Sequence, residues 1–285
     1  MSAPDERKGR GARFGTGGDT ASVPAARTGF RAQTAEISHQ VALAWYFAWS
    51  DTRARYKRSV LGPFWLVLST LIGIGGLALV WAALMKVDAA QFVPSLTIGL
   101  VLWNMISGSV TGSAGVFARN ATVIKNIRTP SLRISLQLLF QQAVNFVHNL
   151  VLVAVVLAIY PQSLSPMALL AIPGLALVLV NLLWVIQLLG FLGARFRDFE
   201  PLIGALMPVL FFMSPVLYRS HQLGTRSFLM GFNPMGYWVE VVREPIVGSV
   251  PSAFTYAMTV AMAIVGWWLA LWMTRAKGHR LAYWV

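Results

Sequence analysis

The sequence has 285 residues, of which 56% are hydrophobic and only 12% charged, a composition that excludes an ordinary soluble domain. Its 23 basic residues outnumber the 10 acidic ones, but the cations lie between hydrophobic runs and not in the aromatic-interleaved patches that bind nucleic acid. Without cysteine, neither disulfides nor thiolate metal sites can form, and four scattered histidines provide little for a metal. We therefore expect a membrane protein without a metal site or a nucleic-acid partner.

The N-terminal region divides into a tail and a helix. Residues 1–35 are rich in Arg, Gly, Ser, Thr and Ala and lack the apolar core of a cleavable signal peptide, so we expect a disordered cytoplasmic tail. Residues 36–60 carry apolar and aromatic side chains before a charged end, namely Val41, Leu43, Ala44, Tyr46, Phe47 and Trp49. This pattern predicts an amphipathic helix in the cytoplasmic membrane interface, with its aromatic rings at headgroup depth.

A basic collar, Arg55, Lys57 and Arg58, lies directly before the first apolar run. Cations at this position are attracted to anionic headgroups, and each contributes roughly 1 kcal/mol near the surface. Membrane anchoring is therefore a sufficient explanation of the collar. Gly62 and Pro63, which follow it, predict a bend at the start of the first span.

Six apolar runs are long enough, or nearly so, to cross the hydrocarbon core of a bilayer, which needs about 20 residues. They lie at 62–85, 95–118, 133–160, 167–193, 201–218 and 253–274. The fifth is short and contains Pro208 and Pro215, so it is predicted to be kinked or partly re-entrant.

The distribution of lysine and arginine predicts the orientation. If both termini are cytoplasmic, the inside segments hold 19 of these residues and the outside segments four, and positive charge is retained inside. The predicted fold class is thus an all-α polytopic membrane protein with six transmembrane helices, N-in and C-in. Its transmembrane domain covers 61–275, and a cytoplasmic tail covers 276–285.

Polar and small residues interrupt two of the runs. In the third, Gln137, Gln141, Asn145 and then His148 or Asn149 fall at helical spacing, so they share one face. Polar groups in hydrocarbon need partners or water, so this stripe either links helices, which we favour, or lines a polar path. In the second run, Gly108, Gly112 and Gly115 predict a close-packing face.

Three connecting segments carry further features. In the loop 118–131, Val123, Ile124 and Ile127 predict the apolar side of a short helix that ends before Pro130, although a plain connection remains the alternative. The turn "ARFRDFE" holds Arg195, Arg197, Asp198 and Glu200, which would pair with one another or with the interface helix, or act in coupling. The outer segment 219–252 is amphipathic: it is either an interfacial anchor, with Glu240 paired to Arg243 or Glu244, or a gate.

Five blocks of sequence together resemble the membrane permease subunit of ABC-2 type polysaccharide exporters, with the O-antigen permeases as the most similar group. The blocks are "RYKRSVLGPFW", "NATVIKNIRTP", "ARFRDFEP", "FFMSPVLY" and "NPMGYWVEVVREPIVG". Their order and spacing match from about residue 40 to the C-terminus, whereas no single block would suffice. The terminal "RLAYWV" is similar as well.

The resemblance implies a homodimer in the bacterial inner membrane, bound to two cytoplasmic ATP-binding subunits. It would move a lipid-linked glycan of the undecaprenyl-diphosphate type outwards, through a channel between the protomers. No G-x-x-x-x-G-K-[S/T] motif occurs, so the chain is not expected to be an enzyme or to hold a cofactor, and ATP and Mg²⁺ would bind to the partner. Capsular polysaccharide, teichoic acid and galactan exporters share this plan and stay open.

Two other classes of membrane protein fit the sequence less well than an exporter does. An ion-coupled secondary transporter is expected to carry acidic residues or a lysine inside its spans, but here the acidic side chains fall at span ends or in loops. A membrane glycosyltransferase would need catalytic carboxylates in a large extramembrane loop, for which only 219–252 is available, with Glu240 and Glu244. Both alternatives are weaker.

The resemblance also implies roles for individual residues. The contact with the ATPase, the coupling surface, would comprise Asn120, Val123, Ile124, Lys125, Ile127 and Arg128. Aromatic rings stack weakly on the apolar faces of sugars, and the channel candidates are Trp65, Trp81, Trp103, Phe211, Phe212 and Tyr218. The outer gate, formed by two short helices that dip into the outer leaflet, would comprise Tyr237, Trp238, Glu240 and Arg243. Because arginine binds phosphate oxygens in a bidentate manner, Arg55, Lys57 and Arg58 would receive the lipid pyrophosphate.

Overall fold

The structure, a computed structural model, describes residues 30–57, 59–62, 64–85, 88–127, 129–218 and 233–285, except for the side chains of 30–33 and 82–85. It divides into two compact units, Met1–Ile37 and Ser38–Val285. Within the described ranges the chain forms helices and connecting turns, with no strand. Of the first unit, only the beginning of the first helix is described, so the architecture below is that of the second.

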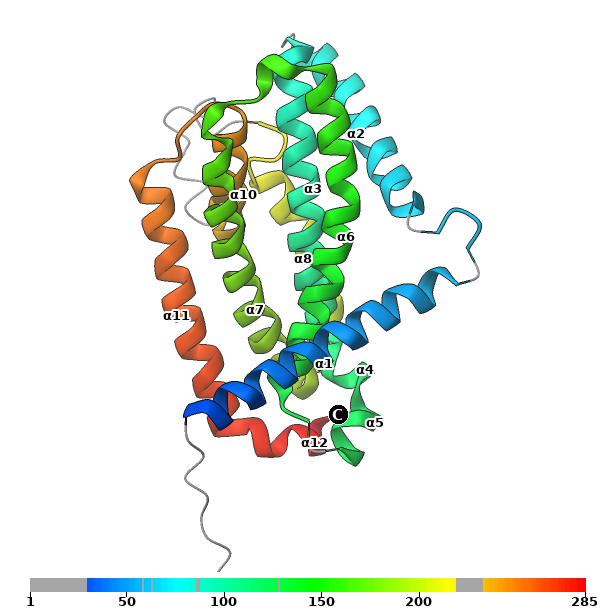
Figure 1. The fold of residues 1–285 in the computed structure, drawn as a ribbon, viewed down its shortest axis with the longest axis vertical. Coiled ribbons are helices and arrows are strands. Elements are labelled where there is room, and N and C mark those ends of the chain that lie inside the picture. Colours follow the sequence, from blue (N-terminus) through cyan, green and yellow to red (C-terminus); the bar gives the residue numbers. More distant parts are fainter. Residues whose placement is uncertain (1–29, 58, 63, 86–87, 128, 219–232) are drawn as a thin grey trace, which may run out of the picture. The chain divides into compact units, whose positions relative to one another are not determined.

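The helices follow one another with short connections (Figure 1). In chain order they are α1 (Phe30–Tyr56), α2 (Phe64–Met85), α3 (Ala89–Ala114), α4 (Val116–Arg119), α5 (Ala121–Asn126), α6 (Ser131–Ile159), the 3₁₀ turns η1 (Pro161–Ser163) and η2 (Pro166–Leu170), α7 (Ala171–Arg195), α8 (Phe199–Met213), α10 (Pro234–Ile246), α11 (Ala253–Lys277), the 3₁₀ turn η4 (Gly278–Arg280) and α12 (Leu281–Trp284).

Five helical segments are long and apolar enough to cross a membrane: Phe64–Trp81, Ala89–Ala114, Ser131–Ile159, Pro166–Arg195 and Ala253–Trp284. They correspond to five of the six predicted runs. The remaining run became α8, which has 15 residues and continues through Pro208. At 1.5 Å per residue α8 measures ~22 Å, short of the roughly 30 Å of a hydrocarbon core, so the expectation of an irregular fifth segment fits its length. Six complete spans stay a prediction.

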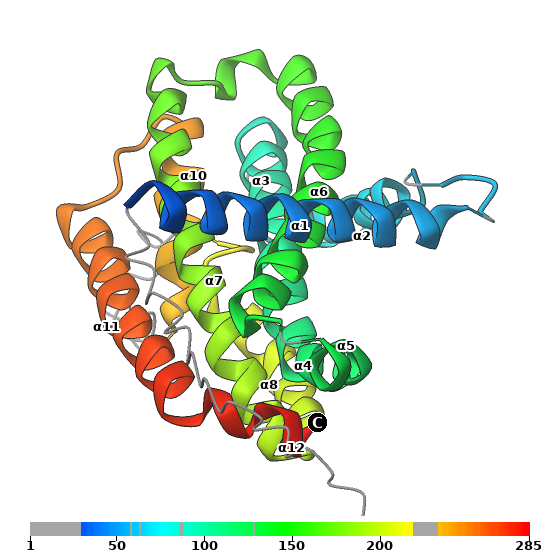
Figure 2. The same cartoon turned by 60° about the horizontal axis from the view of Figure 1, so that its bottom comes forward.

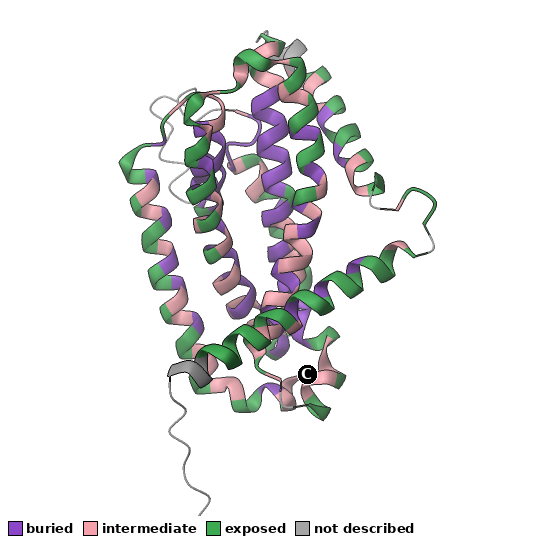
Figure 3. Cartoon of the chain, in the orientation of Figure 1, coloured by how far each residue is buried: buried purple, intermediate pink, exposed green. Residues whose placement is uncertain are grey.

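Helix α3 is the centre of the bundle. It contacts α2, α6, α7, α8 and α10, and most of its residues are buried, whereas few residues of α2 are (Figure 3). The glycine face of α3 packs as predicted: a Cβ atom at Gly108 would meet Gln142, and one at Gly112 would meet Leu138, both on α6. Helix α2, in contrast, buries Ile74 in the core and packs Val67, Leu77, Ala78 and Trp81 partly against it, while most of its other apolar side chains are exposed.

Amide side chains link the helices inside the bundle. Ser135 Oγ on α6 donates to Gln187 Oε1 on α7 (2.6 Å), and Gln187 Nε2 donates to Ser131 Oγ (2.7 Å) and to Thr274 Oγ1 on α11 (3.0 Å). Asn181 Nδ2, two turns away on α7, donates to the Thr259 carbonyl of α11 (3.2 Å). These bonds satisfy buried polar groups that have no water to bind in hydrocarbon.

The predicted boundary of the N-terminal helix was wrong. Helix α1 begins at Phe30 and ends at Tyr56, so residues 30–35, expected to be disordered, are helical, and the helix stops four residues before the predicted end. It ends early because residues 59–62 form a turn, in which Gly62 has a φ of +52° and donates its N–H to Ser59 Oγ (3.1 Å). A left-handed φ favours glycine, which supports the predicted bend, while Pro63 lies outside the described residues.

Candidate transport and coupling sites

The residues predicted to form the coupling surface lie on α5 and at its two ends, and α5 follows the short helix α4 at the end of the bundle where α12 also lies (Figure 2). The predicted short helix is α5, which ends at Asn126, before Pro130, as expected. Asn120 joins α4 to α5, and its Nδ2 donates to the Val116 carbonyl (2.8 Å). Phe117 anchors the pair inside the bundle, with its ring centroid 5.3 Å from that of Phe191 on α7.

The side chains of the coupling surface differ in exposure. Ile127 is 59% exposed and Lys125 is exposed, whereas Val123 and Ile124 are half-buried. Ile124 packs against the core, and α5 contacts the C-terminal α12. Arg128 lies outside the described residues. An exposed apolar side chain beside a cation is the pattern expected of a surface that binds another protein.

An ion pair that the sequence did not predict joins this surface to the start of α8. Arg119 Nη1 lies 3.3 Å from Glu200 Oε1, and Arg119 Nη2 also donates to the Gly112 carbonyl. The predicted pairs within the "ARFRDFE" turn, or with α1, are absent among the ion pairs of the described residues. Both partners are about half exposed, so the pair orients the two elements and contributes little stability.

The polar stripe of α6 has two parts. Gln137 Nε2 and Gln141 Nε2 both donate to Asp51 Oδ2 on α1 (2.7 and 2.8 Å), so for these two the predicted linking role is confirmed. The remaining members bond within α6 itself. Asn145 Nδ2 reaches Gln142 Oε1 (3.5 Å), His148 Nδ1 lies 2.7 Å from the Val144 carbonyl, and Asn149 Nδ2 donates to the Asn145 carbonyl (3.0 Å).

The basic collar lies partly beside a cavity of about 300 Å³ between the end of α1 and α6. Lys57 lines it, together with Trp49, Thr52, Arg53, Tyr56 and His148. Arg55 is exposed but does not line this cavity, and Arg58 lies outside the described residues. Burial raises the pKa of the Tyr56 phenol, and the neighbouring Arg55 guanidinium partly offsets this.

Sequence reasoning missed Arg53, although a signal was present. Trp49, Thr52, Arg53 and Tyr56 are spaced i, i+3, i+4 and i+7, which places them on one face of a helix, and Lys57 follows Arg53 by four residues. Arg55, which belongs to the predicted collar, lies two residues beyond Arg53 along α1. On a helix the two positions point to different sides.

The six channel candidates differ in what their rings contact. Trp65 on α2 and Phe212 on α8 are 61% and 63% exposed, so each presents an open ring face. Trp103 is buried against Phe211, with ring centroids 5.5 Å apart, and Trp81 packs partly against the core. Tyr218 is half-buried and donates its hydroxyl to the Met213 carbonyl (2.8 Å). A channel role for these residues stays a prediction.

Of the outer segment the structure describes residues 233–252, most of which form α10, and α10 is buried among protein helices. Tyr237, Trp238, Glu240 and Arg243 are all less than a tenth exposed, and α10 contacts α3, α7, α11 and η2. An anchor in the membrane interface would leave Tyr237 and Trp238 exposed, so the burial of both side chains argues against that alternative for α10. The second expected gate helix would fall mostly in 219–232, outside the described residues.

Arg243 fastens α10 to the segment that follows α8. Its side chain is completely buried; Nη1 donates to the carbonyls of Pro215 and Tyr218, the latter at 3.3 Å, and Nη2 pairs with Glu244 Oε1 (2.9 Å). Asn233 Nδ2, at the start of α10, donates to the Leu210 carbonyl (3.0 Å) and to Ser214 Oγ (2.8 Å). Helix α10 and residues 214–218 therefore form one hydrogen-bonded unit.

Comparison with known proteins gives a consistent result. Residues 42–247 match the family model described as ABC-2 type transporter. An O-antigen export system permease protein RfbA from Klebsiella pneumoniae is 25% identical over 222 residues, which is 76% of this chain and 86% of that protein. A second from the same organism is 26% identical over 196 residues (68% and 76%), and one from Myxococcus xanthus is 26% identical over 188 (65% and 72%).

The matched range includes five features described above: most of α1, the long helices from α2 to α7, the coupling surface, α8 and α10. The matched range covers most of the chain and includes most of its long apolar helices. The chain is a multi-pass membrane protein and belongs to the ABC-2 type transporter family.

Proposed function

We propose that this chain is the permease subunit of an ATP-driven exporter that moves an O-antigen-like, lipid-linked polysaccharide outwards across the bacterial inner membrane. The observation that carries the proposal is the similarity to O-antigen export permeases over 65% to 76% of the chain. A permease needs an energy source, and the sequence has no phosphate-binding loop of its own. We therefore assign ATP and Mg²⁺ to two cytoplasmic ATP-binding subunits.

A second copy of the chain is the proposed partner within the membrane. Helix α2 exposes Phe64, Trp65, Leu68, Leu71 and Ile72, and α8 exposes Leu202, Leu206, Val209 and Phe212. Two such apolar helices, neither enclosed within the protomer, support a homodimer in which they meet the other copy. In that arrangement Trp65 and Phe212 would provide ring faces for a sugar chain between the protomers.

The proposed orientation has both termini in the cytoplasm, and the absence of cysteine from the natural sequence makes it testable. Single cysteines at Ser163, in η1, and Asn126, at the end of α5, would lie on opposite sides of the membrane, because the whole of α6 separates them. We expect an impermeant maleimide to label Ser163→Cys in intact spheroplasts, and Asn126→Cys only after the membrane is opened. External labelling of Asn126→Cys would overturn the orientation.

Transport itself is tested with the permease and its ATP-binding subunit in proteoliposomes that contain a lipid-linked O-antigen. We expect ATP-dependent movement of the glycan to the far leaflet; a complex that hydrolyses ATP but moves no glycan would refute the proposed function.

In the same assay, the role of the basic collar is tested with Arg55→Lys and Arg58→Lys, which keep the charge but lose the bidentate geometry. If the collar recognises pyrophosphate, glycan-stimulated ATP hydrolysis falls several-fold; unchanged rates would leave the collar as a membrane anchor.

A further inference from the structure

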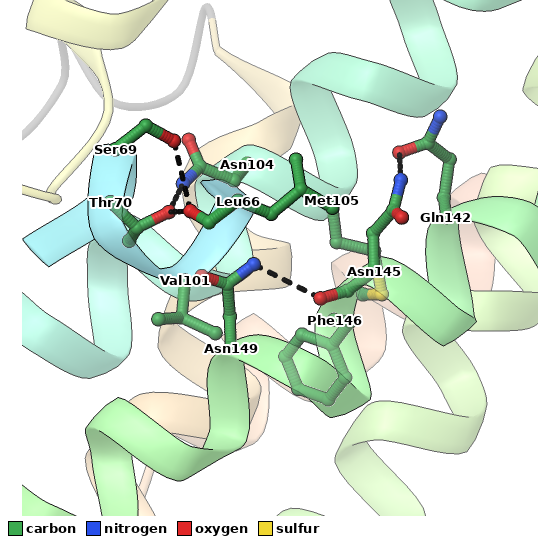
Figure 4. A pocket seen from close by; sticks show the side chains of 10 residues that line it. All are labelled: Leu66, Ser69, Thr70, Val101, Asn104, Met105, Gln142, Asn145, Phe146 and Asn149. Atoms are coloured by element: carbon green, nitrogen blue, oxygen red, sulfur yellow. Dashed lines mark hydrogen bonds between the residues drawn. The ribbon is translucent and has the colours of Figure 1, made fainter. Parts of the chain in front are cut away.

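A polar cavity of about 290 Å³ lies between α2, α3 and α6, three of the membrane-length helices (Figure 4). Six of the side chains that line it carry amides or hydroxyls: Ser69, Thr70, Asn104, Gln142, Asn145 and Asn149. We call it the amide pocket. It differs from the cavity beside the collar, with which it shares no residue.

One buried acceptor in the amide pocket lacks a partner. Asn149 is only 4% exposed; its Nδ2 donates to the Asn145 carbonyl, but its Oδ1 has no hydrogen-bond partner in the described part of the chain. In Figure 4 the side chain points from α6 toward α2. A buried polar atom without a partner costs about 1–3 kcal/mol, and in hydrocarbon no bulk water relieves it. The pocket is therefore built for an occupant that donates a hydrogen bond.

The other polar groups limit the chemistry of that occupant. None of the described side chains that line the pocket is charged, so an inorganic ion or a phosphate would lack a counter-charge. Asn104 Nδ2 donates to Thr70 Oγ1 (3.2 Å), which leaves the Asn104 carbonyl oxygen to accept another bond. An acyl chain would leave these amides unsatisfied. Neutral hydroxyl groups, which both donate and accept, fit them.

Part of the lining is apolar. Val101, Met105 and Phe146 provide hydrophobic surface beside the amides, and Phe146 places an aromatic ring next to Asn145 and Asn149 (Figure 4). A pyranose has the same division, with C–H faces and a rim of hydroxyls, and aromatic rings pack on its C–H faces. A cluster of water molecules provides the hydroxyl chemistry but gains nothing from the apolar wall.

We propose that the amide pocket binds one neutral sugar residue of the transported glycan, with its hydroxyls on Asn149, Asn104 and Asn145. This proposal rests on the proposed function, since it names a site for the glycan of that exporter. Because α2 is mostly exposed and bonds to α3 at this point, an occupied pocket would join α2 to α3 and α6.

The first experiment distinguishes a sugar from water. Ser69→Cys is nearly isosteric and places a thiol at the pocket in a chain without other cysteines. In proteoliposomes with the ATP-binding subunit, we expect a small charged methanethiosulfonate to modify it, and lipid-linked O-antigen to slow that reaction at least fivefold. Ser163→Cys, in η1 and outside both the pocket and the long helices, is the control, and its rate should not change. Modification without protection would mean water alone, and no modification a dry pocket; either result overturns the proposal.

The second experiment keeps the proposal testable if the reporter cysteine perturbs α2. Asn149→Leu removes the unpartnered acceptor at similar size, whereas Asn149→Ser keeps a polar group. We expect the lipid-linked O-antigen concentration for half-maximal ATPase stimulation to rise about tenfold in the leucine variant, the equivalent of one lost hydrogen bond, and to rise less in the serine variant. A purely structural role would change the melting temperature without changing this concentration.

The two proposals can fail separately. If the natural protein does not respond to lipid-linked O-antigen, the proposed function fails, and the amide pocket loses its proposed ligand with it. If the natural protein responds and Asn149→Leu responds at the same concentration, the amide pocket alone is refuted and the exporter stands.

Discussion

Replacing Arg243 with methionine is expected to weaken the attachment of α10 to the segment after α8 and to lower the melting temperature of the purified protein more than any other substitution of a cation. Arg243 is completely buried and donates to the Pro215 and Tyr218 carbonyls while it pairs with Glu244. Methionine fills similar space but leaves these acceptors without their donor. Breaking a buried pair from one side costs about 3–5 kcal/mol.

Two further variants separate charge from geometry at this position. Arg243→Lys keeps the positive charge but offers a single ammonium in place of a planar fork, so it should regain only part of the lost stability. Arg197→Met is the matched control, because Arg197 is exposed and lies outside the ion pairs of the described residues. We expect a clear fall for methionine at 243, an intermediate value for lysine and no shift for the control. Equal melting temperatures for all would show that Arg243 does not hold α10 in place.

Arg243 was predicted to lie in an outer loop, whereas in the structure its side chain is completely buried. Counting cations on either side of the membrane placed Arg243 in an outer loop, since a charge is normally solvated. In the structure the guanidinium is dry, because carbonyls that the non-helical segment 214–218 leaves free provide its acceptors. The sequence could not predict these bonds, because Arg243 and Pro215 lie 28 residues apart in the chain and meet only in the folded structure.

The long apolar helices, in contrast, were predictable because they depend on local sequence and not on contacts between distant segments. Each of α2, α3, α6, α7 and α11 is specified by local composition, because a segment in hydrocarbon must satisfy its own backbone as a helix. The close-packing glycines of α3 were equally local. The C-terminal end of α1 was not, since it depends on the turn at residues 59–62, in which Gly62 has a positive φ.

Contacts between distant segments account for what could not be predicted in the candidate sites. Arg119 and Glu200 are 81 residues apart and pair only because α4 and the start of α8 meet at one end of the bundle. Asn149 belongs to a polar stripe that the sequence predicted, but whether its Oδ1 atom finds a hydrogen-bond partner depends on how α2 packs against α3 and α6. Spacing predicts which face a side chain occupies and does not predict what lies opposite.

The coupling surface leads to the second large effect, which concerns assembly and not stability. Ile127 is 59% exposed next to the exposed Lys125, at the end of the bundle that also holds α12. Burying an isoleucine against a partner contributes about 1.5–3 kcal/mol, and burying an unpaired aspartate in its place costs more than that gain. The double variant Lys125→Glu, Ile127→Asp should therefore lose at least a hundredfold in affinity for the ATP-binding subunit.

Co-purification of the ATP-binding subunit with a tagged permease, together with glycan export by cells, measures this loss. Because neither side chain is part of the buried core, the amount of double variant in the membrane should equal that of the natural protein. Leu164→Asp is the matched control: Leu164 is 53% exposed and follows η1, beyond the far end of α6, where no ATP-binding subunit would reach. It should retain the subunit and export normally. A double variant that does the same would remove α5 and Ile127 from the contact and leave α1 or α12 as the surface through which ATP hydrolysis acts on the membrane helices.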